Sequence, residues 1–369
     1  MANSIDKIEK KTNRALKKQE RLFMDDKDNR RREVIIITIL CVALVVSFVL
    51  SLGLGRYHVP VRDILAILKD FIFGTSDFQG EMQSVVVVTL VRLPRLILCV
   101  LVGMCLSASG AAFQGLFKNP MVSPDVLGVS TGAAVGACIA ILLDFSALST
   151  QLMAFAFGIA AVALVLGLAS SLGKGNPQVV MIILAGMVIS SLFNAVTTLI
   201  KYVAIDADEK LAEITFWLMG SFSKSGSFDN VLTLLIATLL GGIPLLLLRW
   251  RINVLAFSEE EAEAMGVNTK AIRLIIIVCA TIMTASSVSM VGNIGWVGLT
   301  LPHITRLLVG PNYKTLLPTS MLAGAVFLII VDDMARTLTA ADMPIGVFTA
   351  IIGAPLFIYL MFKGKRGWS

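Results

Sequence analysis

The chain has 369 residues, of which 56% are hydrophobic and only 15% are charged, and its net charge is +6. A soluble domain of this length needs far more polar surface, so these proportions exclude an ordinary water-soluble protein. The positive charge does not indicate nucleic acid as a partner, because a large part of the Lys and Arg content lies in one terminal segment.

Residues 1–33 form that charged segment, with eleven Lys or Arg and seven Asp or Glu residues. We expect a cytoplasmic tail beside the membrane, in contact with anionic lipid. The segment is too long and too acidic to begin a cleaved signal peptide, so the apolar stretch that follows it is interpreted as a true span.

Apolar stretches suited to membrane-crossing helices recur along residues 34–362. The sequence therefore predicts an all-α, polytopic transmembrane bundle in that range, followed by a short cytoplasmic tail at 363–369. The overlapping GxxxG pattern of Gly128, Gly132 and Gly136 indicates close packing of helices within the chain rather than a dimer seam. The ten predicted spans are 34–54, 94–117, 126–143, 151–172, 178–202, 230–249, 271–291, 296–309, 317–338 and 344–362.

The distribution of Lys and Arg predicts the orientation of these spans. With the N-terminus in the cytoplasm, 22 of these residues lie inside and 9 outside, but without the tail the split is 11 to 9. The tail therefore decides the prediction, which places both termini in the cytoplasm of a bacterial cell and the bundle in its plasma or inner membrane.

Three connections are longer than tight turns. Gly55–Leu93 is expected outside and contains the amphipathic stretch Val61–Phe73. Val203–Asp229 is also expected outside and contains a candidate short helix, Lys210–Met219. Trp250–Lys270 is expected in the cytoplasm and carries four glutamates.

A short capped helix is predicted within the cytoplasmic connection, over Glu259–Met265. Ser258 is suited to the N-cap position, Glu261 to the reciprocal capping-box position and Gly266 to the end of the helix. Such a helix would be stiff although it lies outside the membrane.

Catalytic motifs are missing from the sequence. The glycine-lysine cluster at 173–175 lacks the upstream Gly and the following hydroxyl residue of a P-loop, and neither HExxH nor GxSxG occurs. Ionisable groups within the spans are few, chiefly Asp332, Asp333 and Arg336. This pattern argues against an intramembrane enzyme and favours transport that a separate subunit powers.

No metal or redox site is predicted. His303 has no Cys, Asp or Glu close to it in the sequence, so a structural hydrogen bond is favoured over metal ligation. The five cysteines occur within apolar stretches without a CxxC pair, and they are interpreted as small buried hydrophobic residues. They are Cys41, Cys99, Cys105, Cys138 and Cys279.

Four ordered motifs resemble the FecCD-type permease family, which includes the vitamin B12, ferric-siderophore and haem permeases. The resemblance covers about residues 35–362, and the charged tail departs from the family pattern. The motifs are RLPR at 92–95; SGAAFQG at 109–115 with NP at 119–120 and LGVSTG at 127–132; GNIGWVGLTLPH at 292–303 followed by Arg306; and MPIGVFTAIIGAP at 343–355.

The resemblance implies a fold of ten spans and a non-enzymatic permease subunit of an ATP-binding cassette importer. The implied partners are a second permease (a copy or a paralogue), two cytoplasmic ATPase subunits that hold ATP and Mg²⁺, and an extracellular substrate-binding protein. No cofactor is expected on this chain itself. A ferric siderophore is the expected ligand, with haem or cobalamin as alternative ligands. The alternative function is that of an ATP-independent secondary carrier.

The resemblance also assigns docking of the binding protein to Arg92, Arg95 and Arg336. We expect them at an outer rim, with Arg92 and Arg95 on one helix face across a turn fixed by Pro94. Snorkelling to lipid headgroups is the alternative. Asp332 lies one turn before Arg336, which predicts an ion pair between them.

Two further sets of residues are assigned at the cytoplasmic side. The first is a segment that couples the permease to the ATPase; it matches Trp250–Lys270, and the alternative interpretation is a solvated acidic turn. The second is a cytoplasmic gate, for which the alternative interpretation is ordinary packing of loops. The coupling residues are Ser258, Glu259, Glu260, Ala262, Met265 and Gly266, and the gate residues are Asn119, Met121, Gln178, Val179 and Val180.

Overall fold

The computed structural model describes residues 29–55, 57–75, 78, 80–173, 179–223, 225–338 and 343–364, and every regular element in these ranges is a helix. The predicted all-α fold is thus confirmed. Most of the two predicted tails lies outside the described residues. The helices are Asn29–Gly53, α2 Val61–Phe73, α3 Met82–Val86, α4 Leu93–Leu116, α5 Val129–Leu142, α6 Ala147–Leu172, α7 Val179–Val203, α8 Asp208–Met219, α9 Phe228–Val254, α10 Glu259–Ala264, α11 Thr269–Val291, α12 Val297–Val309, α13 Tyr313–Thr337 and α14 Ile345–Gly364.

Each of the ten predicted spans corresponds to one of these helices. Eight helices in the described ranges are long and apolar enough to cross a membrane. The other two predicted spans, α5 and α12, have 14 and 13 residues. A helix of 14 residues is about 21 Å long and does not cover a hydrocarbon core of about 30 Å. Both short helices are largely buried, so longer helices surround them.

The span predicted to begin at residue 94 begins earlier, because the helix is continuous through Pro94. Met82–Leu116 forms one helix of 35 residues that includes a π-helical segment, Val87–Arg92, immediately before α4. Proline lacks a backbone N–H and therefore fits where the regular helical hydrogen bonds do not require one. The wider π-helical turn interrupts those regular hydrogen bonds immediately before Pro94. The first turn of α4 therefore accommodates Pro94.

The centre of the bundle is formed by α4 and α11. In the apolar windows of Met82–Leu116, which contains α4, and of α11, 61% and 78% of the residues are buried; α13, which packs against α4, reaches 67%, compared with 6% in the helix Asn29–Gly53. Glycine permits close approach at this centre: a Cβ at Gly103 of α4 would overlap the backbone of Gly324 in α13, and one at Gly110 would overlap Gly298 in α12.

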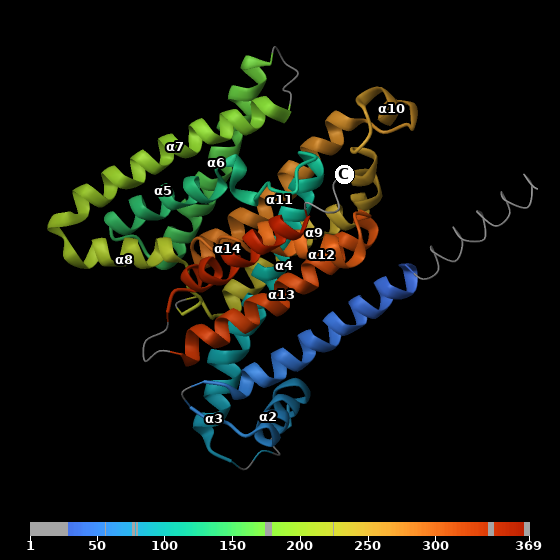
Figure 1. Cartoon of the computed structure of the whole chain (residues 1–369). Coiled ribbons are helices and arrows are strands. Elements are labelled where there is room, and N and C mark those ends of the chain that lie inside the picture. Colours follow the sequence, from blue (N-terminus) through green and yellow to red (C-terminus); the bar gives the residue numbers. More distant parts are fainter. Residues whose placement is uncertain are drawn as a thin grey trace, which may run out of the picture.

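The GxxxG pattern of α5 packs within the chain, as predicted. A Cβ at Gly132 or Gly136 would collide with backbone oxygens of α6, those of Phe157 and Met153. Gly128 lies beside α7 instead, where a Cβ would be 3.1 Å from Ser190 Oγ. Helices α5, α6 and α7 therefore form a compact group beside the centre (Figure 1).

The bundle has two distinct ends (Figure 1). The α10 end carries α10, the start of α7 and the loop that follows α4; the α8 end carries α2, α3 and α8. Helix α2 has the predicted bounds, Val61–Phe73, and α8 begins at Asp208, two residues before the predicted start. The predicted short helices are thus confirmed.

Candidate functional site

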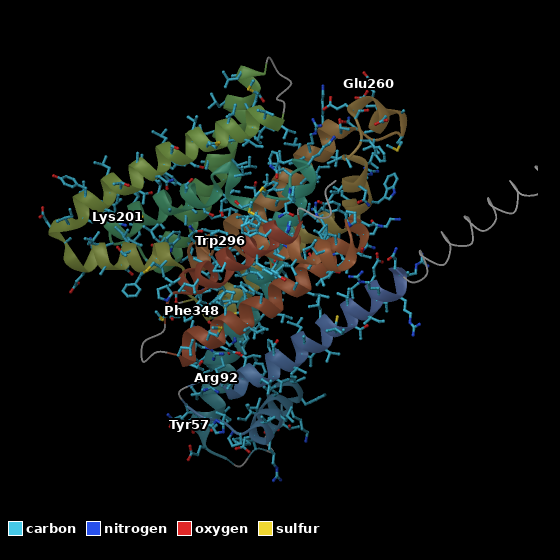
Figure 2. The ribbon with its side chains drawn as sticks, viewed as in Figure 1. Tyr57, Arg92, Lys201, Glu260, Trp296 and Phe348 are labelled. Carbon is cyan, nitrogen blue, oxygen red and sulfur yellow. The ribbon has the colours of Figure 1, made fainter. Side chains whose placement is uncertain are left out.

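The three arginines with a predicted docking role lie at the α8 end and are buried. The exposed fractions are 5% for Arg92, 8% for Arg95 and 7% for Arg336. Arg92 donates from Nη1 to the carbonyl of Leu52, 2.6 Å away, and from Nη2 to the carbonyl of Tyr57. Figure 2 shows Arg92 close to Tyr57, below the bundle centre. Arg92 is thus bonded to the end of the first helix and to the loop after it.

Arg95 and Arg336 share one carboxylate partner on α13, Asp332. Arg95 donates to Asp332 from Nε at 3.1 Å and from Nη2 at 2.8 Å. Arg336 Nε lies 3.0 Å from Asp332, and its Nη2 donates to Asp333 and, at 2.7 Å, to Ser51 of the first helix. Ser51 in turn donates to Asp333. These five residues and Arg92 are called the arginine cluster below.

The expected open rim of cations is therefore a buried cluster whose charges face each other. Burial of charge is unfavourable unless each group has partners, and here Arg95 and Arg336 pair with two carboxylates while Arg92 bonds to backbone carbonyls. Three guanidinium groups and two carboxylates leave one net positive charge. The predicted pair of Asp332 and Arg336 is confirmed. Sequence reasoning missed Asp333 and Ser51 as partners, and docking itself stays a prediction.

The predicted caps of α10 are confirmed. Ser258 Oγ accepts from the backbone N–H of Glu261 at 3.2 Å, and a carboxylate oxygen of Glu261 accepts from the backbone N–H of Ser258 at 2.9 Å. At the other end, the N–H of Val267 donates to the carbonyl of Ala262 at 3.0 Å while Gly266 has a φ of 74°. A capping box and a left-handed glycine turn thus close both ends of a single-turn helix.

Two cationic side chains attach α10 to the bundle. Lys118 donates from Nζ to the carbonyl of Phe257 at 2.8 Å, and Arg273 of α11 lies 2.7 Å from a carboxylate oxygen of Glu259. Lys118 follows α4 and Arg273 belongs to the first turns of α11. A displacement of α10 would therefore pull on two central helices.

The rest of α10 presents an acidic and apolar surface. Glu260 is exposed at the tip of the α10 end (Figure 2), and Met265 and Phe257 are 45% and 52% exposed. Ala262 is fully buried and faces the bundle. Hydrogen bonds from Ser258 lower the pKa of Glu261, and the bond from the backbone N–H has a larger effect than the bond from the hydroxyl. The surface is therefore suited to contact a partner while its base stays packed.

The predicted gate residues lie partly in the turn after α4. Lys118 has a φ of 49°, and the N–H of Asn119 donates to the carbonyl of Gln114 at 3.1 Å, so a left-handed turn ends the helix. Asn119 Oδ1 accepts from the N–H of Met121, which is 49% exposed. Because Lys118 also contacts the α10 loop, this turn and the predicted coupling segment are adjacent.

The other gate residues are at the start of α7. Val179 is half-buried and packs against the core, whereas Val180 is 60% exposed. Gln178 lies outside the described residues. A gating role for any of these positions stays a prediction.

Two expectations about single residues are wrong. Neither ring nitrogen of the buried His303 has a hydrogen-bond partner within the described ranges, and its ring instead meets the edge of Phe357 at 6.0 Å. Cys41 is exposed on the first helix, while Cys99, Cys105, Cys138 and Cys279 are buried as expected. Cys41 differs because its helix lies at the periphery.

A polar stripe on α7 was not predicted. Ser191, Asn194 and Thr198 are exposed and recur at the helical spacing of three and four residues, and only 17% of the apolar window of this helix is buried. An exposed amide is unfavourable in hydrocarbon, so this face is suited to water or protein rather than to lipid. The spacing of these three residues is a signal that could have revealed it. They are called the polar α7 face below.

Comparison with known proteins places this geometry in a family. The model of the FecCD transport family matches residues 43–363. The "Molybdate import system permease protein MolB" of Haemophilus influenzae is 41% identical, over 89% of this chain and 95% of its own length. The "Probable iron chelatin transport system permease protein" of Helicobacter pylori is 38% identical, over 89% of this chain and 98% of its own length.

A solved structure agrees with this result. It shows an inward-facing conformation of a transporter described as a metal-chelate type ABC transporter. The match has a TM-score of 0.79 and 39% identity, and it covers 89% of this chain and 99% of that chain. The chain therefore belongs to the FecCD transport family and is an inner-membrane permease of an ABC importer.

Proposed function

We propose that this permease imports a ferric siderophore and works with a second permease, two cytoplasmic ATPase subunits and an extracellular binding protein. The proposal includes an orientation in which the α10 end and both termini face the cytoplasm and the α8 end faces outward. The name of the Helicobacter relative supports an iron chelate as the ligand. The Haemophilus relative is named for molybdate, so the ligand requires a direct test.

The capped helix α10 is the observation that carries the proposal. It is closed at both ends, exposed at Glu260 and Met265, and fastened to α4 and α11 through Lys118 and Arg273. A helix of this kind can enter a cleft of an ATPase subunit and move as a rigid body. Its movement would reach the adjacent turn at Asn119, where we place one element of the cytoplasmic gate.

The polar α7 face supports the proposal that a second permease subunit packs against this chain. Because lipid would leave Asn194 unsatisfied, we place this face against a second permease and a hydrated pathway between the two. Helix α7 would then line the route of the ligand. Its start, at Val179 and Val180, lies at the α10 end and would narrow or open with the gate.

Docking of the binding protein is placed at the arginine cluster. The cluster lies at the α8 end and carries one more positive than negative charge. A carboxylate of the docked protein would compete with Asp333 for Arg336, the arginine bonded to both α13 and the first helix. Asp333→Asn is therefore expected to tighten capture of the binding protein severalfold, as measured by surface plasmon resonance.

Uptake by the reconstituted complex tests the function. Proteoliposomes containing this chain, its ATPase and the binding protein should accumulate ⁵⁵Fe-labelled siderophore when ATP is present, and an ATPase variant that cannot hydrolyse ATP should abolish accumulation. Ser258→Ala should lower uptake severalfold without lowering ATP binding, because loss of an N-cap costs about 1 kcal/mol. Gradient-driven uptake by this chain alone would instead establish a secondary carrier.

A further inference from the structure

A cavity of about 600 Å³ lies at the α8 end, between the ends of α5, α6, α8 and α11 and the residue before α14. Its volume is within the range of sites for small ligands. One part of the wall is aromatic, from Phe145, Phe216 and Trp217. Five further lining residues carry hydroxyl groups, namely Thr150, Ser221, Ser223, Ser225 and Ser289.

The hydroxyl hydrogens of this wall are directed at the protein. Thr150 donates to the carbonyl of Ser146 at 3.1 Å, and Ser289 donates to the carbonyl of Ser286 at 3.0 Å. Ser225 donates to the carbonyl of Met290. A hydroxyl has one hydrogen to donate and two lone pairs that accept, so these groups offer the cavity mainly acceptors.

Charged side chains add to this bias. Asp144 and Glu213 line the cavity, and carboxylates only accept hydrogen bonds when ionised. The ammonium group of Lys210 donates to Asp144 and to the carbonyl of Leu142. Helix direction does not add to it, because the carboxyl ends of α5 and α11 and the amino end of α6 all lie at this wall and carry partial charges of opposite sign. The amide of Gln151 can donate, yet acceptors predominate.

We propose that this cavity binds a metal chelate that donates hydrogen bonds and bears no net negative charge, such as a ferric trihydroxamate with amide or amine groups. The aromatic wall would contact the apolar part of the chelate, while the hydroxyl and carboxylate oxygens accept its N–H groups. Molybdate and ferric citrate are anions and are disfavoured by the same wall. The site rests on the proposed function, since the proposed orientation opens it to the outside.

Binding to the permease and ATPase complex in lipid nanodiscs, without the binding protein, tests the site. Equilibrium dialysis with ⁵⁵Fe-ferrioxamine B, a cationic trihydroxamate, should show saturable binding, and molybdate and ⁵⁵Fe-citrate should bind at least tenfold more weakly. Thr150→Val keeps the size of the side chain and removes the hydroxyl acceptor, so affinity for ferrioxamine B should fall about fivefold.

A matched control is Thr38→Val. Thr38 is an exposed residue of the first helix whose hydroxyl makes the same bond to the carbonyl four residues earlier, at 2.8 Å. This variant should bind ferrioxamine B normally. Asp144→Lys should weaken ferrioxamine B and strengthen ferric citrate, which separates a charge effect at the cavity from a loss of folding.

Three results would overturn the site: no saturable binding of ferrioxamine B, preference for the anions, or equal losses in Thr150→Val and Thr38→Val. If ATP-driven uptake with the binding protein proceeds while the purified complex binds no ferrioxamine B, the cavity is not a ligand site and the importer function stands. If the complex binds the probe but uptake does not depend on ATP, the importer function fails and the site stands.

Discussion

At the scale of single residues, the arginine cluster joins the first helix to the rest of the bundle. That helix buries little of its surface, so few apolar contacts attach it. The carbonyl of Leu52 at its end and that of Leu54 just beyond it accept hydrogen bonds from Arg92 and Arg336. Cations near the carboxyl end of a helix satisfy free carbonyls and interact favourably with its dipole. The cluster is therefore an anchor, whatever it also does in docking.

The central ion pair of the cluster is expected to be sensitive to loss of one partner. Arg95→Ala should lower the free energy of unfolding by about 3–5 kcal/mol, because it leaves Asp332 buried with one guanidinium fewer. Thermal unfolding in detergent measures this. Asp144→Asn is the control, since Asp144 is 79% exposed and its pair with Lys210 should contribute at most about 1 kcal/mol. Similar shifts for both variants would contradict the anchor.

Glu261 gives a pH-dependent prediction. Its pKa is lowered by the hydrogen bonds from Ser258, so the ionised form is favoured in folded α10. The contribution of the capping box should be fully present above the ordinary carboxyl pKa, about 4.3, and be lost as pH falls through the lowered value. Carboxyl ¹³C titration by NMR should place the Glu261 midpoint higher in Ser258→Ala than in the parent; an unchanged midpoint would refute the reciprocal bond.

At the scale of elements, the central packing depends on glycines that face backbone. The seam between α4 and α13 passes through Gly103 and Gly324, and the seam between α4 and α12 passes through Gly110 and Gly298. Neither seam has space for a methyl group. Rigid backbone contact of this kind suits helices that must keep a fixed distance while the ends of the bundle move.

Gly103→Ala tests the seam. The added methyl group would overlap the carbonyl of Gly324, so we expect a loss of roughly 1–3 kcal/mol of unfolding free energy. Gly167→Ala is the matched control on α6, because nothing lies within 4 Å of its added Cβ, and alanine favours helix over glycine. The control should be neutral or slightly stabilising. Equal effects in a thermal denaturation series would show that the seam is not tight.

At the scale of the whole molecule, the two ends differ in what they offer to partners. The α10 end presents a capped, acidic helix with exposed Phe257 and Met265, whereas the α8 end presents the arginine cluster and the hydroxyl-lined cavity. Proteins that bind the bundle from the two sides of the membrane would therefore contact different surfaces. The proposed orientation decides which partner meets which end.

Labelling of single cysteines tests the orientation. In a variant whose five native cysteines are replaced, Asp144→Cys should react with a membrane-impermeant maleimide in intact spheroplasts, because it is exposed at the α8 end. Glu260→Cys should react only after permeabilisation. The reverse pattern would invert the topology and with it the proposed positions of the ATPase and the binding protein.

Local chemistry explains how much of the fold could be predicted. Apolar stretches about 20 residues long indicate helices wherever they stand, and the helices α2, α8 and α10 follow from short amphipathic or capped segments. Ser258, Glu261 and Gly266 are neighbours in sequence, so their cap could be deduced without any knowledge of the fold. The pair of Asp332 and Arg336 likewise lies within one helical turn.

Contacts between distant segments were decided only by the tertiary structure. Arg95 and Asp332 are 237 residues apart, and Ser51 is 285 residues from Arg336, so no local pattern indicates that these groups neutralise each other. The same holds for the packing of the His303 ring against Phe357 and for the cavity beside Trp217. The physical reason is that helix formation depends on neighbours along the chain, whereas burial and charge pairing depend on which helices pack together.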